Sequence, residues 1–459
     1  MTRTSQWATV VLAAGQGKRM QSSLPKVLHP VCGKEMARHV LDAARDAAGR
    51  RIVLVVGQGA EAVRERLGVG FQYVAQTRQL GTGHALMQAE QALAGQAAHV
   101  LVLYGDTPLI QAGTLKRLMA QHEDSGAVMT LLTSNLTPTA GLGRIERDGV
   151  GRVTRIVEEA EADEAQRAIR EINGGMYGFR ADWLWPALHR LTPSRSGELY
   201  LTDLVALAVR DGLPVSSVAS SEELEIFGVN NRVQLAQAER AMRERILTRW
   251  MLAGVTLVDP QSTYIDAEVS IGQDTTILPN TILQGRTAIG LRCQIGPNSI
   301  VQDSSIGDDC KVVASVLEEA ELASHVDVGP FSHLRPGAVI EQEVHIGNFA
   351  EVKASRLGRG TKMGHFSYMG DATVGKNVNI AAGTITCNFD GVNKNPTEIG
   401  DDAFIGCDTM LVAPVKVGDR SVTGAGAVVT KDVPSDSLAV GMPARVRRRV
   451  VKGKQEGGV

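Results

Sequence analysis

Apolar residues in the second half of the chain recur with a period of about six residues. Between positions 271 and 418 an apolar residue often directly precedes a glycine, and most successive spacings are six, a multiple of six, or one residue fewer. Helices have a period of 3.6 residues and ordinary strands a period of two, so neither produces this pattern. A solenoid of very short strands does, because three such segments close one coil of about 18 residues. The pairs begin at Ile271, Ile289, Ile295, Ile306, Val328, Ile346, Leu357, Met363, Val374, Ile399, Ile405 and Val417.

The repeat also predicts what its two residues do in each coil. We expect the apolar residue to fill the interior, and the glycine beside it to permit a tight corner and a positive φ. Neighbouring coils then stack about 4.8 Å apart through backbone hydrogen bonds. An ordinary sandwich with frequent turns is the weaker alternative. Hexapeptide repeats of this kind resemble the left-handed parallel β-helix of the acyltransferase superfamily, which departs from the usual right-handed crossover and implies acyl transfer.

The first half of the chain alternates strand-like and helix-like segments. Continuous apolar runs predict buried strands at residues 10–13, 52–56, 99–104 and, with a weaker pattern, 128–133. Helical patterns lie between them at residues 36–48, 82–93 and 115–122. This alternation indicates a Rossmann-like α/β domain whose mostly parallel sheet is covered on both faces. Ligands bind such sheets at the carboxyl ends of the strands, so we expect a site formed by residues 14–20 and 104–106.

A helical pattern separates the two halves. Apolar residues recur there every three or four positions among arginines and glutamates, which is typical of an amphipathic helix; they are Leu235, Ala238, Met242, Ile246 and Trp250. We expect this helix to pack on its own chain rather than on a coiled partner. The expected organisation is a first domain at residues 1–230, a linker helix at 231–252, and a β-helix at 253–459 that ends in a basic tail.

Composition narrows the class of protein. The chain has 459 residues and a net charge of −2, so general nucleic-acid binding is not expected. Only 4% of its residues are aromatic, which suits a β-helix interior built from aliphatic residues. Its five cysteines are odd in number and form no CxxC motif, which favours a reducing compartment over a disulfide framework. The first apolar stretch is too short for a signal peptide or a membrane span. We therefore expect a soluble, cytoplasmic enzyme.

A glycine-rich loop follows the first predicted strand. Gly15 and Gly17 expose backbone N–H groups, and Lys18, Arg19 and Lys26 supply positive charge, as a polyphosphate requires. The loop lacks the spacing of a P-loop, and Met20 stands where a dinucleotide fingerprint has its third glycine. A structural turn is the alternative for such a loop.

Asp106 follows Tyr104 and Gly105 at the expected carboxyl end of a strand. A carboxylate at this place suits a hard cation such as Mg²⁺. A turn cap is the alternative role for the same residue.

The residues around this loop carry a specific resemblance. Leu12 to Met20 reads LAAGQGKRM and is followed by Pro25 and Lys26, which resembles the signature of sugar-1-phosphate nucleotidyltransferases. Together with the hexapeptide half, the chain over about residues 7–440 resembles the bacterial bifunctional N-acetylglucosamine-1-phosphate uridyltransferases/glucosamine-1-phosphate acetyltransferases. That resemblance implies acetylation of glucosamine 1-phosphate by acetyl-coenzyme A, followed by transfer of UMP from UTP with release of pyrophosphate.

The resemblance assigns roles in the first half. Lys26 would neutralise charge on the phosphates, and Asp106 and Asn230 would bind Mg²⁺. Gly143, Glu158 and Asn173 would contact N-acetylglucosamine. The remaining nucleotide- and sugar-binding positions are Leu12, Ala13, Ala14, Gly15, Gln76, Gly81, Thr82, Tyr104 and Gly105.

It also assigns an acetyltransfer site in the second half. His365 would be the general base that takes a proton from the sugar's amine, a task for which its intrinsic pKa suits it near neutrality. An exposed coil histidine without a role is the alternative. Glucosamine 1-phosphate would be bound by Arg335, Lys353, Tyr368 and Asn379. Acetyl-coenzyme A would be bound by Ala382, Asn388, Phe389, Cys407, Ala425 and Arg445.

The chain departs from the family pattern at several of these positions. A spacing of 25 residues between Val374 and Ile399 predicts an inserted loop, in which Phe389 replaces a tyrosine and loses its hydroxyl contact. Cys407 stands where serine is common, and Arg445 takes the place of an arginine expected near Met442. The basic tail, formed by Arg447, Arg448, Arg449, Lys452 and Lys454, is either a solvated end or a binding site for the coenzyme's 3′-phosphate; general RNA binding is a weaker alternative than either.

Two further hypotheses keep the first half as a nucleotidyltransferase and change the second. In one the β-helix is structural or regulatory; in the other it is a trimerisation scaffold without a site. The residues around His365 speak against both, because a framework needs none of them. The resemblance implies small-molecule substrates and a homotrimer formed through the β-helix, with the acetyltransfer site between subunits.

Overall fold

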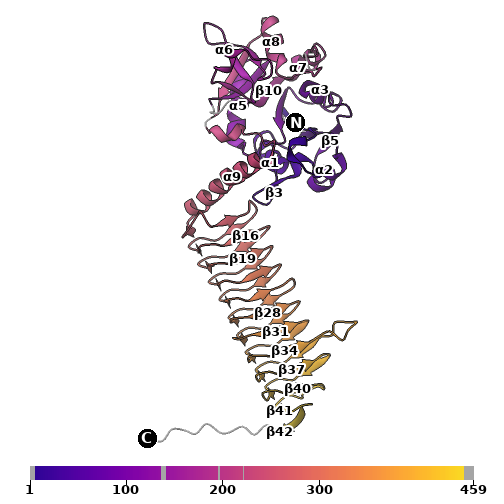
Figure 1. Cartoon of the computed structure of the whole chain (residues 1–459), viewed down its shortest axis with the longest axis vertical. Helices are drawn as coiled ribbons and strands as arrows, with labels where there is room; N and C mark the ends of the chain where they lie inside the picture. Colours follow the sequence, from indigo (N-terminus) through magenta and orange to yellow (C-terminus); the bar gives the residue numbers. More distant parts are fainter. Residues whose placement is uncertain (1–5, 136–140, 195–196, 221, 449–459) are drawn as a thin grey trace, which may run out of the picture. The chain divides into compact units, whose positions relative to one another are not determined.

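The chain forms two compact units, Met1–Met242 and Arg243–Val459 (Figure 1). The computed structural model describes residues 6–135, 141–194, 197–220 and 222–448. The boundary between the units falls within helix α9 (Arg232–Leu252). In the first unit Leu235, Ala238 and Met242 of this helix pack around Met20 and Met36. Among the described residues, none of the helices is both long enough and apolar enough to cross a membrane.

The first unit is built on one sheet with strand order β11-β7-β10-β6-β1-β4-β5. All adjacent strands on this path run parallel except β10, which is antiparallel to both of its neighbours. The expectation of a mostly parallel sheet is therefore confirmed. The strands are β1 (Trp7–Ala13), β4 (Ile52–Val56), β5 (Gln72–Ala75), β6 (His99–Tyr104), β7 (Met129–Ser134), β10 (Ile172–Arg180) and β11 (Val215–Ala219), with β8 (Arg144–Arg147) and β9 (Val153–Val157) beside β10 and the separate pair β2 (Pro30–Val31) and β3 (Lys34–Glu35).

Helices connect these strands. The α-helices are α1 (Met36–Ala48), α2 (Ala60–Leu67), α3 (Thr82–Met87), α4 (Glu90–Leu93), α5 (Ala112–Ser125), α6 (Glu164–Arg167), α7 (Ala181–Leu188) and α8 (Asp203–Arg210), and the 3₁₀ helices are η1 (Lys18–Met20), η2 (Lys26–Leu28) and η3 (Glu223–Ile226). The expectation of one helix over residues 82–93 is wrong, because two short helices occupy it. Gln88 Nε2 donates to the His84 carbonyl at 3.0 Å, so its side chain takes the acceptor that its own backbone N–H would use in a continuing helix.

Both faces of the sheet are buried, which explains the continuous apolar runs. Along β1, Val10 and Leu12 belong to one hydrophobic cluster and Val11 and Ala13 to another on the opposite face. Strands β4 and β6 divide their side chains between the same two clusters. The loops at the carboxyl ends of β1 and β6 are thereby held at one edge of a rigid sheet.

The second unit consists of three long parallel sheets whose strands are two to four residues long (Figure 1). From β12 to β41, consecutive strands belong to different sheets, so the chain winds as a β-helix, and the expected fold class is confirmed. The first sheet contains β12 (Thr256–Leu257), β15 (Thr276–Ile277), β18 (Gln294–Ile295), β21 (Lys311–Val312), β24 (Asp327–Val328), β27 (His345–Ile346), β30 (Lys362–Met363), β33 (Asn379–Ile380), β36 (Phe404–Ile405), β39 (Val422–Thr423), β41 (Ser437–Val440) and β42 (Arg445–Arg448).

The other two sheets are built in the same way. One contains β13 (Tyr264–Ile265), β16 (Ile282–Gln284), β19 (Ile300–Gln302), β22 (Val316–Glu318), β25 (His333–Leu334), β28 (Ala350–Lys353), β31 (Ser367–Gly370), β34 (Ile385–Cys387), β37 (Met410–Val412) and β40 (Val428–Val429). The last contains β14 (Ser270–Ile271), β17 (Ala288–Ile289), β20 (Ser305–Ile306), β23 (Glu321–Leu322), β26 (Val339–Ile340), β29 (Arg356–Leu357), β32 (Ala372–Val374), β35 (Thr397–Ile399) and β38 (Val415–Val417).

The apolar member of each repeat fills the interior, as expected. In the last of these sheets, Ile271 pairs with Ile289 and Ile289 with Ile306, and all three side chains are buried. The apolar residues form such ladders from coil to coil, so each interior position packs on its equivalents above and below.

The role expected for the glycines is wrong. Of the twelve glycines in the repeated pairs, all in the described part of the chain, only Gly296 and Gly329 have a positive φ. The left-handed corners are formed by other residues, such as Asp274 and Asn280. The glycines are needed because the next coil is close: a Cβ on Gly272 would lie 2.5 Å from the carbonyl carbon of Gly290.

One coil carries the predicted insertion. Ala372 of β32 pairs with Thr397 of β35, a step of 25 residues, whereas the next step in the same sheet, from Thr397 to Val415, is 18. The extra residues form a loop that projects beside β34 (Figure 1). Within the loop the Asp390 carboxylate accepts hydrogen bonds from the backbone of Val392 and Asn393.

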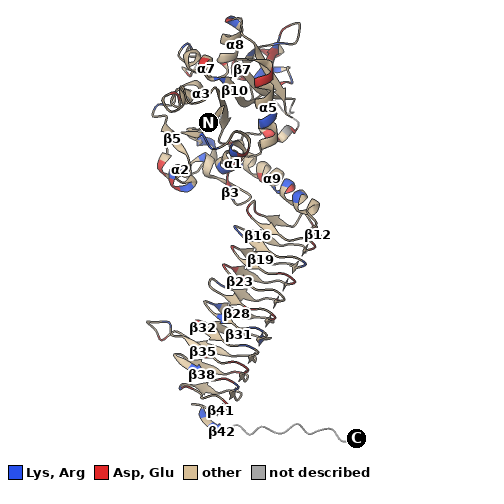
Figure 2. Cartoon of the chain, turned by 180° about the vertical axis from the view of Figure 1, so that it is seen from behind, with Lys and Arg blue, Asp and Glu red and all other residues tan. Residues whose placement is uncertain are grey.

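The solenoid ends in an antiparallel pair. Strand β42 pairs with β41 and places Arg445 opposite Val440. Arg447 and Arg448, expected in a basic tail, lie in this strand and are exposed (Figure 2). Arg449, Lys452 and Lys454 lie outside the described residues.

Candidate active sites

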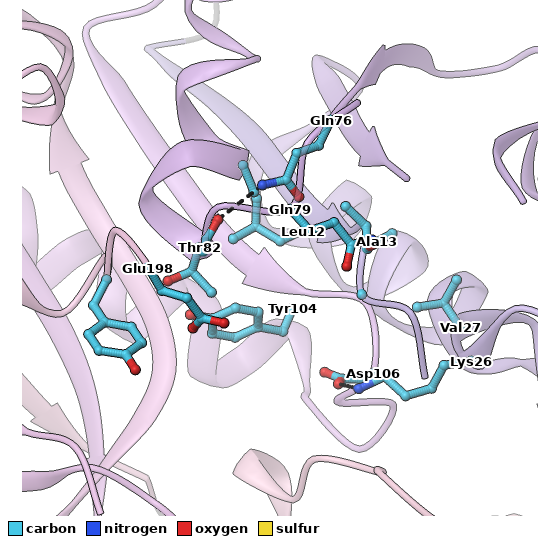
Figure 3. Close-up of a pocket in the computed structure, with 15 residues that line it drawn as sticks. Leu12, Ala13, Lys26, Val27, Gln76, Gln79, Thr82, Tyr104, Asp106 and Glu198 are labelled. Carbon is cyan, nitrogen blue, oxygen red and sulfur yellow. Dashed lines mark hydrogen bonds and ion pairs between the residues drawn. The ribbon is translucent and has the colours of Figure 1, made fainter. Parts of the chain in front are cut away.

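A cavity of about 350 Å³ lies at the carboxyl edge of the first unit's sheet (Figure 3). Ten residues expected to bind nucleotide, sugar or metal line it: Leu12, Ala13, Ala14, Gly15, Lys26, Gln76, Gly81, Thr82, Tyr104 and Asp106. They come from the ends of β1, β5 and β6, from η2 and from the start of α3. The parallel topology explains their meeting, because it brings the ends of these strands to one edge.

Lys26 joins the two residues expected to bind a metal. Its Nζ forms an ion pair with Asp106 Oδ2 and lies 3.1 Å from Asn230 Oδ1. Arg19 Nη2 also donates to Asn230 Oδ1 at 3.1 Å. One carboxylate and one amide oxygen therefore converge on a single cationic group.

This donor pair suits a hard cation that is held mainly by its other ligands. Among the residues that the structure describes, no three His, Cys, Asp or Glu side chains are grouped to bind a metal. Mg²⁺ needs no such group, since it commonly keeps several waters and binds one or two protein oxygens together with substrate phosphates. The convergence of Asp106 and Asn230 on Lys26 fits that mode.

Gly17 permits the approach of Lys26. Gly17 has a φ of 61°, and a Cβ there would lie 2.8 Å from the Lys26 Cβ. The glycine-rich loop is thus required both for its left-handed backbone and for contact with the residue that supplies positive charge.

Five residues that line the cavity were not expected there: Val27, Gln79, Ala85, Glu198 and Tyr200. Gln79 Nε2 donates to the Ala14 carbonyl at 2.7 Å, and Glu198 and Tyr200 line the cavity from a segment without a recognised motif. That segment is held by the Gly81 turn: Leu199 N donates to the Leu80 carbonyl at 2.8 Å, and a Cβ on Gly81 would lie 2.6 Å from the Leu199 carbonyl oxygen. The positive φ of Gly81 marks the turn, but nothing local indicates what packs on it.

The residues expected to contact the sugar lie together next to the cavity. A Cβ on Gly143 would lie 3.7 Å from both the Asn173 Cβ and Glu158 Oε2. The Glu158 carboxylate accepts a hydrogen bond from Thr202 Oγ1 at 2.7 Å. Burial raises the pKa of Glu158, and the negative charge of Asp203 adds to this effect, while the Thr202 hydrogen bond opposes it.

Tyr104 connects this group to the cavity. Its phenol interacts with the hydroxyl groups of Thr82 and Tyr177, and burial raises its pKa, so it remains a neutral phenol at physiological pH. Gly105, the residue between Tyr104 and Asp106, donates its backbone N–H to the Leu12 carbonyl at 2.9 Å. Gly105 therefore connects the two strand ends on which the cavity is built.

The second expected site lies at one corner of the β-helix. His365 is exposed and follows β30, at the corner where the chain passes to β31. Ala382, Cys407 and Ala425 occupy the equivalent corner in the next three coils, linked by hydrogen bonds from Asp408 N to the Ala382 carbonyl (2.7 Å) and from Gly426 N to the Cys407 carbonyl (2.8 Å). Three of the six expected coenzyme positions thus form a column that continues from His365.

The expected sugar-phosphate residues lie on both sides of that corner. Arg335, Lys353 and Tyr368 belong to coils of the β25-β28-β31 sheet, and Arg335 Nη1 pairs with Glu351 Oε1 at 2.8 Å. Asn379 lies in the other sheet, in register with Lys362 of β30. In a triangular coil the outer faces of two sheets diverge at the corner between them, so one chain presents a convex surface here.

The inserted loop lies next to the same sheet. Asn388 is buried and its Nδ2 hydrogen-bonds to Asp371 Oδ2, which also lies 4.0 Å from Lys353 Nζ. Phe389 is exposed and pairs through its backbone with Lys394. Asn388 is therefore part of the sheet surface, whereas Phe389 faces solvent in this single chain.

Two segments match known domain families. Residues 9–195 match the MobA-like NTP transferase domain. Residues 396–431 match the family described as bacterial transferase hexapeptide (six repeats). Together with the cavity and the β-helix, these matches define a nucleotidyltransferase joined to a hexapeptide-repeat transferase.

Comparison with whole proteins shows the family. The chain is 49% identical over 432 residues to the bifunctional protein GlmU of Heliobacterium modesticaldum, covering 94% of each chain. It is 49% identical over 445 residues to that of Pelobacter propionicus, covering 96% of this chain and 97% of the relative. With the GlmU protein of Caldanaerobacter subterraneus subsp. tengcongensis it shares 48% identity over 453 residues, 97% of this chain and 99% of the relative. The chain belongs to the GlmU family of bifunctional proteins, which confirms the resemblance recognised in the sequence.

Proposed function

We propose that this bifunctional transferase makes UDP-N-acetylglucosamine in two steps. The β-helix transfers an acetyl group from acetyl-coenzyme A to glucosamine 1-phosphate, and the first unit then transfers UMP from UTP to the product. The observation that carries the proposal is the convergence of Lys26, Asp106 and Asn230 in a cavity of the nucleotidyltransferase unit, on a chain whose family is bifunctional.

In the uridylyl step the chain mainly positions ionised groups. The sugar-phosphate oxygen attacks the α-phosphorus of UTP and pyrophosphate leaves. A phosphate nucleophile is already ionised, so no general base is needed, and orientation with charge neutralisation supplies the rate. Lys26 leaves its ion pair with Asp106 to face the phosphates.

Mg²⁺ is the cation proposed for Asp106 and Asn230. When bound there together with the nucleotide phosphates, Mg²⁺ would neutralise the charge that develops in the transition state. Gly143, Glu158 and Asn173 hold the sugar beside it, and Leu12 to Gly15, Gln76, Gly81 and Thr82 hold the nucleotide.

In the acetyl step His365 is proposed as the general base. Its side chain is exposed at the corner from which the coenzyme column continues, within a group of polar and cationic residues. It accepts a proton from the amine of glucosamine 1-phosphate as the amine attacks the thioester carbonyl, and the coenzyme thiol leaves. Arg335, Lys353, Tyr368 and Asn379 bind the sugar phosphate.

The acetyltransfer site is proposed to be completed by neighbouring subunits of a homotrimer. The convex corner supports this, because the faces that carry Tyr368 and Asn379 diverge in one chain. Phe389 in the projecting loop and Arg445 in β42 then contact coenzyme held between subunits. Since UTP and acetyl-coenzyme A are cytoplasmic metabolites, the enzyme is placed in the cytoplasm.

A nucleotidyltransferase with a purely structural β-helix is the second candidate, supported by the regularity of the coils. Assays of the purified full-length protein separate the two. The proposed function predicts release of free thiol from acetyl-coenzyme A that depends on glucosamine 1-phosphate, and release of pyrophosphate from UTP that depends on both Mg²⁺ and N-acetylglucosamine 1-phosphate. Pyrophosphate release without any thiol release would favour the structural β-helix instead.

A further inference from the structure

Tyr177 holds the side chain of Asn173 in the first unit. Tyr177 is fully buried in β10, and its hydroxyl accepts a hydrogen bond from Asn173 Nδ2 at 2.6 Å. The other end of the Asn173 amide is also engaged, since Gly175 N donates to Asn173 Oδ1 at 3.1 Å. Both polar ends of the side chain are therefore fixed before any ligand binds.

An irregularity in β10 creates this contact. Residues four apart in a regular strand lie roughly 13 Å apart, too far for such a hydrogen bond. The register of β10 against β7 shifts between Asn173 and Tyr177, with Asn173 opposite Thr133 and Tyr177 opposite Leu131. Bulges of this kind re-aim side chains next to active sites.

Two glycines make the irregularity possible. Gly175 has a φ of 72°, and a Cβ there would lie 2.8 Å from the Tyr104 ring. A Cβ on Gly174 would lie 2.8 Å from the Leu132 carbonyl oxygen. The Asn-Gly-Gly sequence thus serves to bring Asn173, Tyr104 and Tyr177 together.

The contact continues toward the nucleotide side of the cavity. The hydroxyl of Tyr177 interacts with that of Tyr104, which interacts in turn with Thr82. Thr82 and Tyr104 line the cavity, whereas Tyr177 does not. A chain of buried and half-buried polar groups therefore runs from the nucleotide side to Asn173 (Figure 3 shows its cavity end).

We propose that Tyr177 is a positioning residue for the uridylyl acceptor: its hydroxyl presets the Asn173 amide that binds N-acetylglucosamine 1-phosphate. This rests on the proposed function, in which Asn173 contacts the sugar. Tyr177 itself touches no substrate. Its burial keeps its pKa high, so the hydroxyl stays protonated and available throughout the working pH range.

The substitution Tyr177→Phe tests the proposal because it removes one oxygen and keeps the ring. A single hydrogen bond corresponds to roughly three- to tenfold in binding, so the KM for N-acetylglucosamine 1-phosphate should rise by that factor. The KM for UTP and the kcat should change less than about twofold on the same grounds. In the double variant with Asn173→Ala, removing the Tyr177 hydroxyl should cause no further rise.

Tyr73→Phe is the matched control. The Tyr73 hydroxyl donates to the Gly68 carbonyl at 2.6 Å in the same unit, and Tyr73 does not line the cavity. The Tyr73→Phe substitution should lower the melting temperature about as much as Tyr177→Phe does, without changing the KM for N-acetylglucosamine 1-phosphate. An equal rise in both KM values in Tyr177→Phe, or the same kinetic change in Tyr73→Phe, would reduce Tyr177 to a structural residue and overturn the proposal.

The sugar-binding role of Asn173 and the positioning role of Tyr177 can be tested separately. If Asn173→Ala leaves the acceptor KM unchanged, the sugar-site assignment of the proposed function is wrong. If Asn173→Ala raises that KM and Tyr177→Phe does not, the assignment stands and the positioning role of Tyr177 is wrong.

Discussion

Lys26 and Asp106 form an ion pair at the carboxyl ends of the parallel strands, and the same lysine nitrogen lies 3.1 Å from Asn230 Oδ1. Both members of the pair are largely buried, with side chains 13% and 19% exposed. In a partly buried site a charge left without its partner is costly, so the pair must exchange partners when ligands enter. In the proposed function, the ammonium then faces the phosphates and the freed carboxylate faces Mg²⁺.

Asp106→Asn should therefore abolish uridylyl transfer and spare acetyl transfer. The amide retains the shape of the side chain but removes the charge that draws a cation beside the phosphates. We expect at least about a 100-fold fall in kcat for pyrophosphate release, as when a group that stabilises transition-state charge is lost. Thiol release from acetyl-coenzyme A should remain within about twofold of wild type, since the acetyl step uses residues of the second unit.

Asp211→Asn provides the control for this substitution. Asp211 also pairs with a cationic side chain, Arg190 at 2.7 Å, and does not line the cavity. It should leave both half-reactions unchanged. Retained uridylyl transfer in Asp106→Asn would show that Asp106 is not a metal ligand.

Glu158 should make acceptor binding depend on pH. Burial, and then Asp203, raise the pKa of this carboxyl above its ordinary value, so it takes up a proton at a higher pH than an exposed glutamate. If the carboxylate accepts hydrogen bonds from the sugar, the KM for N-acetylglucosamine 1-phosphate should rise as the pH falls through that raised value. Glu158→Gln cannot titrate, so the difference between the two pH profiles isolates Glu158 from the titration of the substrate phosphate.

The same shift has a consequence for stability, with a definite sign. Between the ordinary pKa and the raised one, the folded state binds more protons than the unfolded state, so unfolding becomes easier as the pH rises. Above the raised pKa the penalty of the buried charge is complete. Glu158→Gln should therefore raise the melting temperature of the first unit at pH 8 and have little effect at pH 4, as measured by calorimetry. A lower melting temperature for Glu158→Gln at pH 8 would contradict the raised pKa.

His365→Ala should abolish acetyl transfer and spare uridylyl transfer. Loss of a general base typically slows a reaction by about 10²- to 10⁴-fold. His345→Ala is the matched control, because His345 is an exposed histidine one coil earlier in the same solenoid. If the two variants release thiol at equal rates, the base is another group.

Replacing a repeat glycine with alanine should destabilise the β-helix where the next coil lies too close for a Cβ atom. In Gly272→Ala the new Cβ would meet backbone atoms of Gly290 at 2.5 Å, so the coils must separate locally, at a cost of about 1–3 kcal/mol as for other overpacked sites. Gly364→Ala is the control, because nothing lies within 4 Å of its Cβ position. Thermal unfolding followed by circular dichroism should show a lower transition for Gly272→Ala only. Equal transitions would mean that the coils give way without cost.

The sequence could predict whatever depends on periodicity. The six-residue period indicates the β-helix, and the 25-residue spacing indicates its loop, because both are local counts along the chain. The function of the glycines could not be predicted in this way. Gly272 is required because Gly290, a full coil later, lies close to it. The local sequence does not show that contact, and it suggests only that a glycine permits a tight corner or a positive φ.

The cavity shows the same division between local motifs and long-range contacts. Asp106 follows the end of β6, and Lys26 lies in η2 at the end of the motif that begins after β1. Both motifs are recognisable in the sequence, and the parallel topology brings the ends of β1 and β6 together. Glu198 and Tyr200 reach the cavity only because Leu199 packs on the Gly81 turn, and no residue near position 199 indicates that contact. The hydrogen bond between Asn173 and Tyr177 likewise depends on a register shift against β7.

An aromatic column on the β-helix should be required for assembly. Phe331 and Phe349 are 61% and 60% exposed, and their rings stack with centroids 5.4 Å apart. Phe366 is exposed one coil further, since Ala350 pairs with Ser367. Apolar surface of this kind is stabilised when a second surface covers it. If the chain assembles as the proposed homotrimer, the double variant Phe331→Gln/Phe349→Gln should shift the mass measured by light scattering from that of the trimer to that of a monomer and abolish acetyl transfer. Leu291→Gln, at an exposed apolar position on another corner, should change neither. A monomeric variant with full acetyl transfer would show that the site is complete within one chain.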